Sequence, residues 1–237
     1  MNRANITLAC AQPQSIFLKR SKVSRRIIQI CILGLILTGC ARSPEVNFYV
    51  LNPISEQQQT NQYHDIHIGL DEITIPPYMN KPQFIIHSTP HLVKMSEKDQ
   101  WAGPLDKNIQ RVIKVNLSTL LPGTVIENIP WSNQFKPNYQ LSIDISQFEV
   151  DISGDSIFRA SYVIYSGDQI RKKGTVYYHQ KTTDVTMNTL VTSMNANLNR
   201  FTYHIAKVLS AILRTPAPDL TKKSVQPAAK ESNHSSK

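Results

Sequence analysis

A basic segment followed by a short apolar one is the feature that most limits what this chain can fold into. Five basic and no acidic residues lie between Lys19 and Arg26, and they lead directly into an apolar stretch from Ile27 to Leu37. A helix that crosses a membrane needs about 20 apolar residues, so this stretch is too short to span one. A basic and then an apolar segment of this kind is typical of a cleaved secretory signal. We therefore expect the folded domain to be built only from the residues that follow.

The apolar stretch ends in the tetrapeptide Leu37-Thr38-Gly39-Cys40. This tetrapeptide resembles the bacterial lipobox, in which the cysteine thiol is alkylated by diacylglycerol, the chain is cut before the cysteine and the new amine is acylated. The resemblance implies a signal peptide of residues 1–39 and a covalent diacylglycerol and N-acyl lipid on Cys40, with no other cofactor. Each buried CH2 of the acyl chains contributes about 0.8 kcal/mol, so attachment to the membrane would be effectively permanent.

Two further details concern the ends of this signal. Residue Ala41 stands where enteric lipoproteins retained at the inner membrane carry aspartate, so the expected location is the outer membrane, lipid-anchored on its periplasmic face. Residues 1–18 form an unusually long neutral preamble to a signal, which indicates a misassigned start, with Leu18 or Val23 as the alternatives. The mass of the uncleaved precursor tests this, and a precursor that begins at Met1 would contradict it.

The formal charge of +9 is largely a property of the signal. Residues 1–40 hold 6 of the 26 basic residues and none of the 17 acidic ones, which leaves +3 for the mature chain. A near-neutral domain lacks the basic surface that nucleic acid requires, so we expect no nucleic-acid partner. Cys10 and Cys31 leave with the signal and Cys40 carries lipid, so the mature monomer has no cysteine pair for a disulfide.

Hydrophobic periodicity after Cys40 predicts one α+β domain over residues 40–214, in which a mixed, largely antiparallel β-sheet is packed by two main amphipathic helices. Strands are expected at 48–51, 66–75, 83–87, 91–96, 138–152, 157–165 and 170–180. Helices are expected from Pro104 to Leu121 and from a cap at Asp184 to Leu213. Residues 215–237 are rich in Lys, Ser and Pro without periodicity, which is typical of a disordered tail.

The longest predicted strand contains a change of phase. Its apolar set runs through Leu141, Ile143 and Ile145 and then shifts by one residue, which predicts a β-bulge at Ser146 and Gln147. The strand is longer than the helices need to cover, so we expect it to present an exposed edge. Such an edge can pair with a neighbouring subunit, and on this ground we predict a homo-oligomer.

Several short stretches occur in the order found in a known family. They are Phe48-Tyr49-Val50-Leu51, residues 75–83 (Ile-Pro-Pro-Tyr-Met-Asn-Lys-Pro-Gln), Trp101-Ala102-Gly103-Pro104-Leu105 leading into Arg111-Val112 and Asn116-Leu117, and Pro130-Trp131. In this ordered set behind a lipobox, the chain resembles the ABC-type transport auxiliary lipoproteins. It departs from them at Tyr78-Met79-Asn80-Lys81, where the family more typically has Tyr-Leu-Asp-Arg, and at Gly103, where an acid is common.

The resemblance implies a non-enzymatic accessory subunit of an envelope-spanning lipid transport system. Its implied partners are an MCE-domain transport protein similar to PqiB and, through the anchor, outer-membrane lipids. One alternative is an assembly or chaperone lipoprotein that binds an outer-membrane protein. A second is a hydrolase of envelope polymers, for which the sequence offers no constellation of acid, base and nucleophile.

Six residues are candidates for partner binding. Tyr78 and Trp101 are either core or rim aromatics or contacts to a partner, because Tyr and Trp are enriched at binding hot spots. From the family stretches, Pro76, Pro82, Arg111 and Trp131 join them by resemblance.

Candidate metal and catalytic groups are weaker. His87 with His91 and His64 with His67 have suggestive spacing, but Pro90 favours a strand and turn over a helical pair of ligands. Asp151 and Asp155 flank Gly154 in an expected hairpin, where aspartate favours the turn itself. We therefore expect no catalytic residues, no metal and no enzyme.

Overall fold

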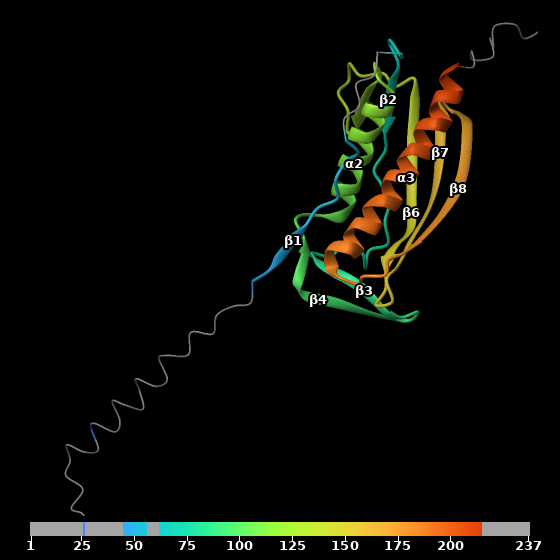
Figure 1. Cartoon of the computed structure of the whole chain (residues 1–237). Helices are drawn as coiled ribbons and strands as arrows, with labels where there is room; N and C mark the ends of the chain where they lie inside the picture. The colour runs from blue at the N-terminus through green and yellow to red at the C-terminus, as the bar shows by residue number, and fades with distance from the viewer. Residues whose placement is uncertain (1–25, 27–44, 56–61, 215–237) are drawn as a thin grey trace, which may run out of the picture. The chain divides into compact units, whose positions relative to one another are not determined.

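A long antiparallel meander forms where the alternating segments in the second half of the chain pair with one another. The computed structural model describes residues 26, 45–55 and 62–214 (Figure 1). In it β6 (Tyr139–Val150), β7 (Asp155–Ser166) and β8 (Gln169–Lys181) are antiparallel neighbours. Two short strands, β2 (His67–Leu70) and β5 (Val125–Asn128), add parallel to the β6 side and give the order β5-β2-β6-β7-β8.

A second, smaller sheet is built from the earlier segments. It has the order β1-β4-β3, with β1 (Asn47–Tyr49) parallel to β4 (Leu92–Trp101) and β3 (Gln83–Thr89) antiparallel to it. The two sheets meet at an isolated bridge between His87 and Asp151, where Ile152 N donates to His87 O at 3.0 Å. The small sheet therefore lies beside the end of β6 (Figure 1).

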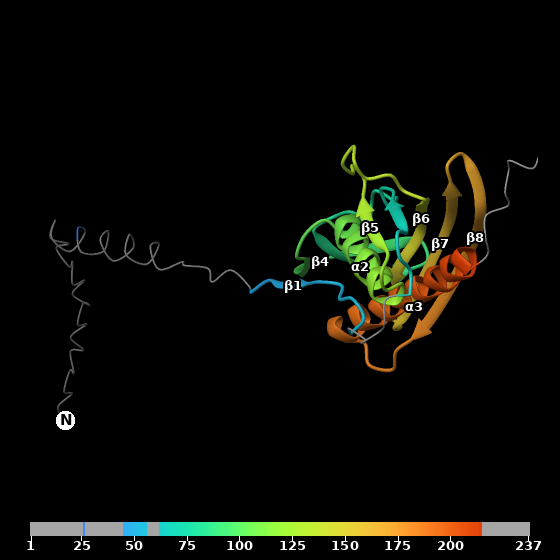
Figure 2. The same cartoon turned by 90° about the horizontal axis from the view of Figure 1, so that it is seen from above.

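Two helices cover one face of the large sheet, α2 (Leu105–Leu120) and α3 (Met187–Arg214), and Figures 1 and 2 show them on the same side. Each turns its apolar stripe inward, as the spacing of three and four predicts. The core between helices and sheet includes these residues, all at most 2% exposed: Ile109, Val112, Ile113, Leu117, Leu141, Ile143, Ile145, Phe158, Ile164, Leu198, Phe201, Ile205 and Leu209.

The predicted fold class is confirmed, and so is the bulge. The β6–β7 register shifts between Ile145 and Gln147, so the apolar side chains on both sides of Ser146 reach the same core. Helix α2 begins and ends within one residue of its expected limits. Of the described strands, β5 was not predicted, because its four residues are too short to show a period.

Two expectations were wrong. Helix α3 begins at Met187, after Thr186 and not after Asp184, and the backbone N–H of Thr189 donates to Thr186 Oγ1 at 3.3 Å. The exposed edge is not on β6: Ile145 N donates to Thr74 O at 2.8 Å on the side away from β7. Among the described strands of the large sheet, the long unpaired edge belongs to β8. Self-association stays a prediction.

The predicted signal peptide, Cys40 and the predicted tail over residues 215–237 lie outside the described residues. Neither described helix combines the length and the apolar character that crossing a membrane would require.

Candidate partner-binding site

Three segments that are far apart in the sequence meet at one end of α2. We call residues 76–82 the proline corner and residues 101–104 the Trp101 loop. The backbone N–H of Trp101 donates to Pro82 O at 2.8 Å, and the N–H of Ala102 donates to Tyr49 O at 2.9 Å. Strand β1, the proline corner and the Trp101 loop are thus held as one backbone unit.

Asn80 connects this unit to helix α2. Pro104 stands at the N-cap position without a side-chain acceptor, although the first N–H groups of a helix need partners. Asn80 Oδ1 supplies one from another segment and accepts from Leu105 N at 3.2 Å. The departure from the family's aspartate at this position therefore keeps a capping oxygen without its charge.

The chain that follows β1 is fastened by two polar side chains of α2. One guanidinium nitrogen of Arg111 donates to Leu51 O at 2.6 Å. Asn116, which is fully buried, accepts from Ile54 N at 2.8 Å and donates to Asn199 Oδ1 of α3 at 2.8 Å. Arg111 is exposed, but its guanidinium already donates a hydrogen bond to the backbone of Leu51.

The proline corner is the exposed part of the unit. Tyr78, Asn80, Lys81 and Pro82 are exposed, and Pro76 is half-buried. A hollow of about 280 Å³ lies between the corner and the Trp101 loop, and it is lined by Asn80, Lys81, Pro82, Trp101, Ala102, Gly103 and Pro104. This surface has the shape and the mixed polarity that a partner segment could occupy.

The two aromatic candidates differ in exposure. Trp101 is 4% exposed and its ring lies 4.9 Å from that of Phe84. It therefore packs as a core aromatic, the first of the two alternatives that the sequence left open. Tyr78 is 38% exposed, and its hydroxyl donates to Glu149 Oε1. Burial, and then the hydrogen bond and charge of Glu149, raise the pKa of Tyr78 well above its ordinary value. The phenol therefore stays a proton donor.

Glu149 joins the proline corner to a second hollow. Its Oε1 also lies 3.5 Å from His87 Nε2. The hollow has a volume of about 400 Å³ and is lined by the ends of β3, β6 and β7: His87, Ser88, Thr89, Pro90, Gln147, Glu149, Val150, Asp151, Ile152, Ser153, Asp155 and Ile157. The sequence pattern gave no signal for Glu149, because Tyr78 and His87, which it joins, are 71 and 62 positions away.

Asp155, at the edge of this hollow, leads to a prediction about pH. Lys181 Nζ lies 2.9 Å from its Oδ2 and His179 Nε2 lies 2.7 Å from its Oδ1. The hydrogen bond from Lys181, followed by those from Ser153 and His179, lowers the pKa of Asp155 from 3.8 to about 2. Its contribution to stability is therefore complete above the unfolded pKa of 3.8 and is lost as the pH falls through 2.

Urea midpoints of the parent and Asp155→Asn proteins between pH 6 and about pH 2 test this. We expect a constant difference above about pH 4 that shrinks below it. Lys181→Gln should also weaken the dependence of stability on pH below about pH 4, because it removes the first partner that lowers the pKa of Asp155. Two pH profiles that run parallel to the acid limit would contradict the assignment.

Trp131 lies apart from the proline corner. Its ring covers Gly69 of β2 so closely that a Cβ there would come within 2.9 Å of it, and it lies 5.9 Å from the ring of Phe135. Phe135 in turn stacks on His67 at 5.3 Å. Of the six candidate residues, the structure thus gathers Pro76, Tyr78, Pro82 and Trp101 at the proline corner and the Trp101 loop. Arg111 lies on α2 against the chain that follows β1, and Trp131 lies elsewhere.

Known proteins resemble this chain over most of the domain. The family model of the ABC-type transport auxiliary lipoprotein component matches residues 49–206. The chain is 24% identical over 147 residues to the intermembrane transport lipoproteins PqiC of Escherichia coli K12 and of Shigella flexneri, covering 61% of this chain and 76% of each relative.

Two solved structures share the fold. An uncharacterized protein has a TM-score of 0.60 and 16% identity, covering 70% of this chain and 99% of its own. A protein from Xanthomonas campestris has a TM-score of 0.55 and 12% identity, covering 72% and 96%. With its family model matched from β1 into α3, this chain belongs to the ABC-type transport auxiliary lipoprotein family.

Proposed function

We propose that the chain is an accessory subunit of an MCE-type envelope-spanning lipid transport system, anchored through acylated Cys40 at the periplasmic face of the outer membrane. Its role is to dock the distal end of an MCE-domain protein similar to PqiB and to position it against that membrane. The role is non-enzymatic. Covalent diacylglycerol and an N-acyl chain on Cys40 are its lipid.

One observation carries this proposal. The stretches by which the chain resembles its family are distant in sequence, yet backbone hydrogen bonds join β1, the proline corner and the Trp101 loop. The side chain of Arg111 holds the chain that follows β1. Much of this bonding is inward and structural, and what it leaves outside is a rigid corner with Tyr78, Lys81 and Pro82 exposed. A rigid exposed loop loses little conformational entropy on binding, which favours a docking role.

The relatives support the transport setting. The two PqiC proteins are named as intermembrane transport lipoproteins, and a lipoprotein that works between membranes needs a partner able to reach across the envelope. The near-neutral charge of the domain is compatible with a protein partner bound through shape and local contacts.

Site-specific photocrosslinking in intact cells tests the proposal. A photoreactive phenylalanine analogue placed at Lys81, exposed on the proline corner, should form an adduct with the MCE-domain protein, identified by mass spectrometry. The same analogue at Lys207, exposed on α3, is the matched control and should give no such adduct. Adducts with only an outer-membrane protein at Lys81 would contradict the proposal and favour the assembly or chaperone alternative.

A further inference from the structure

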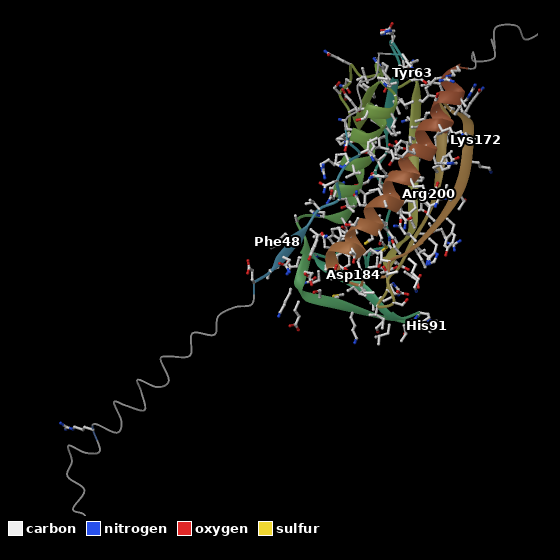
Figure 3. The ribbon with its side chains drawn as sticks, viewed as in Figure 1. Phe48, Tyr63, His91, Lys172, Asp184 and Arg200 are labelled. Atoms are coloured by element: carbon white, nitrogen blue, oxygen red, sulfur yellow. The ribbon has the colours of Figure 1, made fainter. Side chains whose placement is uncertain are left out.

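The small sheet has an inner and an outer face. Its inner face packs in the core, where Phe84 lies 6.3 Å from Tyr49 and 4.9 Å from Trp101, measured between ring centroids. Side chains alternate along a strand, so the neighbours Phe48 on β1 and Ile85 on β3 belong to the opposite, outer face. Figure 3 shows Phe48 projecting from β1, away from the helices.

The register carries this face across the hairpin of β3 and β4. Ile85 pairs with Met95 and His87 pairs with Val93, and paired residues share a face. Phe48 is 64% exposed and Met95 is 51% exposed, while Ile85 and Val93 are half-buried. We call Phe48, Ile85, Val93 and Met95 the outer apolar face. His87 shares this face through its pairing with Val93, and its imidazole lies 3.5 Å from Glu149 at the border with β6.

The distance to the anchor decides what can cover this face. Strand β1 begins at Asn47, seven residues after Cys40. Seven residues span at most about 25 Å when fully extended. Phe48 is the residue after Asn47, so the outer apolar face begins within this distance of Cys40. This inference rests on the proposed acylation of Cys40, which fixes that end of the tether in the bilayer.

Charge does not direct the face to another kind of partner. Lys98 and Glu97 are neighbours and are both exposed on β4, so the strand carries charges of both signs. A surface with this balance gains little from anionic headgroups and most from burying its apolar side chains. The contact should therefore form on zwitterionic and anionic bilayers alike.

We propose that the outer apolar face is a membrane-contact surface, which lies on the bilayer that holds Cys40, with Phe48 and Met95 at the boundary between headgroups and acyl chains. Apolar side chains of peripheral proteins are buried about 5–10 Å into that boundary. This contact gives the domain a fixed orientation relative to the bilayer. It also sets the proline corner, which precedes β3 directly, beside the membrane surface.

Neighbouring residues on β4 supply a matched test. Lys94 pairs with Ile86, which packs against the core, so Lys94 is exposed on the inner side while Met95 lies on the outer face. Met95→Cys and Lys94→Cys place one thiol each at neighbouring positions of β4, on its two opposite faces. An environment-sensitive fluorophore on each thiol is followed in the mature acylated chain, reconstituted into phosphatidylcholine vesicles with brominated acyl chains.

We expect bromine to quench the fluorophore at Met95 at least about twofold more than the one at Lys94. Equal quenching at both sites, or none at either, would overturn the proposal. A shielded fluorophore at Met95 that bromine does not quench would show that a second copy or another protein covers the face, and would also overturn it.

The parent chain separates this inference from the anchor on which it rests. With Cys40 acylated, the mature parent has no free thiol and takes no label. A labelled parent would overturn the anchor and this inference together. An unlabelled parent with no difference between the two sites would overturn only the membrane contact and leave the docking role standing.

Discussion

Replacing Cys40 by alanine is expected to remove all acyl label from the protein and to eliminate the acylated mature form. The reason is chemical: the thioether to diacylglycerol needs the sulfur atom, and cleavage before residue 40 follows that alkylation. Metabolic labelling with an alkyne fatty acid and the mass of the N-terminal peptide measure the effect. Because each buried CH2 contributes about 0.8 kcal/mol, losing the acyl chains removes essentially the whole hold on the bilayer.

The matched control is Cys31→Ala, which replaces a cysteine inside the apolar stretch of the predicted signal. This variant should incorporate the fatty acid as the parent does. Label that persists in Cys40→Ala would contradict the assignment of the anchor. Label that disappears in Cys31→Ala as well would show that the assay reports the integrity of the signal and not the acylated residue.

Replacing Phe158 by alanine should cause the largest loss of stability, about 3–5 kcal/mol in the free energy of unfolding. Phe158 is fully buried in the first half of β7. Its ring lies 5.6 Å from Phe148 of β6, 6.2 Å from Tyr178 of β8 and 5.1 Å from Phe201 of α3. Removing it leaves a cavity that three strands and a helix border, and none of them can close it alone.

Urea unfolding of the mature sequence carrying Cys40→Ala, followed by circular dichroism, measures this loss without lipid. A loss of this size is a large part of the roughly 5–15 kcal/mol that holds a typical domain together. Val163→Ala is the control on the same strand, half-buried on the face away from the helices, and should cost about 1 kcal/mol or less. Equal losses would show that the two faces of β7 are assigned the wrong way round.

What the sequence could predict was set by local periodicity. Helix α2 was predictable almost to the residue, because Leu105, Ile109 and Val112 repeat at helical spacing between Pro104 and Gly123. The β6 bulge was predictable because a one-residue shift in alternation has few other causes. The start of α3 was misplaced because Asp184 and Thr186 both suit a cap, and the choice depends on where the preceding strand ends.

The site depended on contacts between distant segments, which local patterns do not encode. The sequence singled out the proline corner and Trp101 but not that Pro82 and Tyr49 would accept hydrogen bonds from the Trp101 loop. Nor did it indicate that Trp131 would cover Gly69, since nothing in either segment shows that they face each other. Resemblance to a family found these residues, and the structure separated structural roles from exposed ones.

The most direct test of the docking role is the dissociation constant between the acylated chain and the MCE-domain protein of the same organism, measured with both partners purified. We predict that the parent binds, that Lys81→Glu raises the constant at least about tenfold, and that Lys207→Glu, on α3, leaves it within about twofold. A parent chain that does not bind the MCE-domain protein, or an equal loss with both variants, would contradict the proposed function.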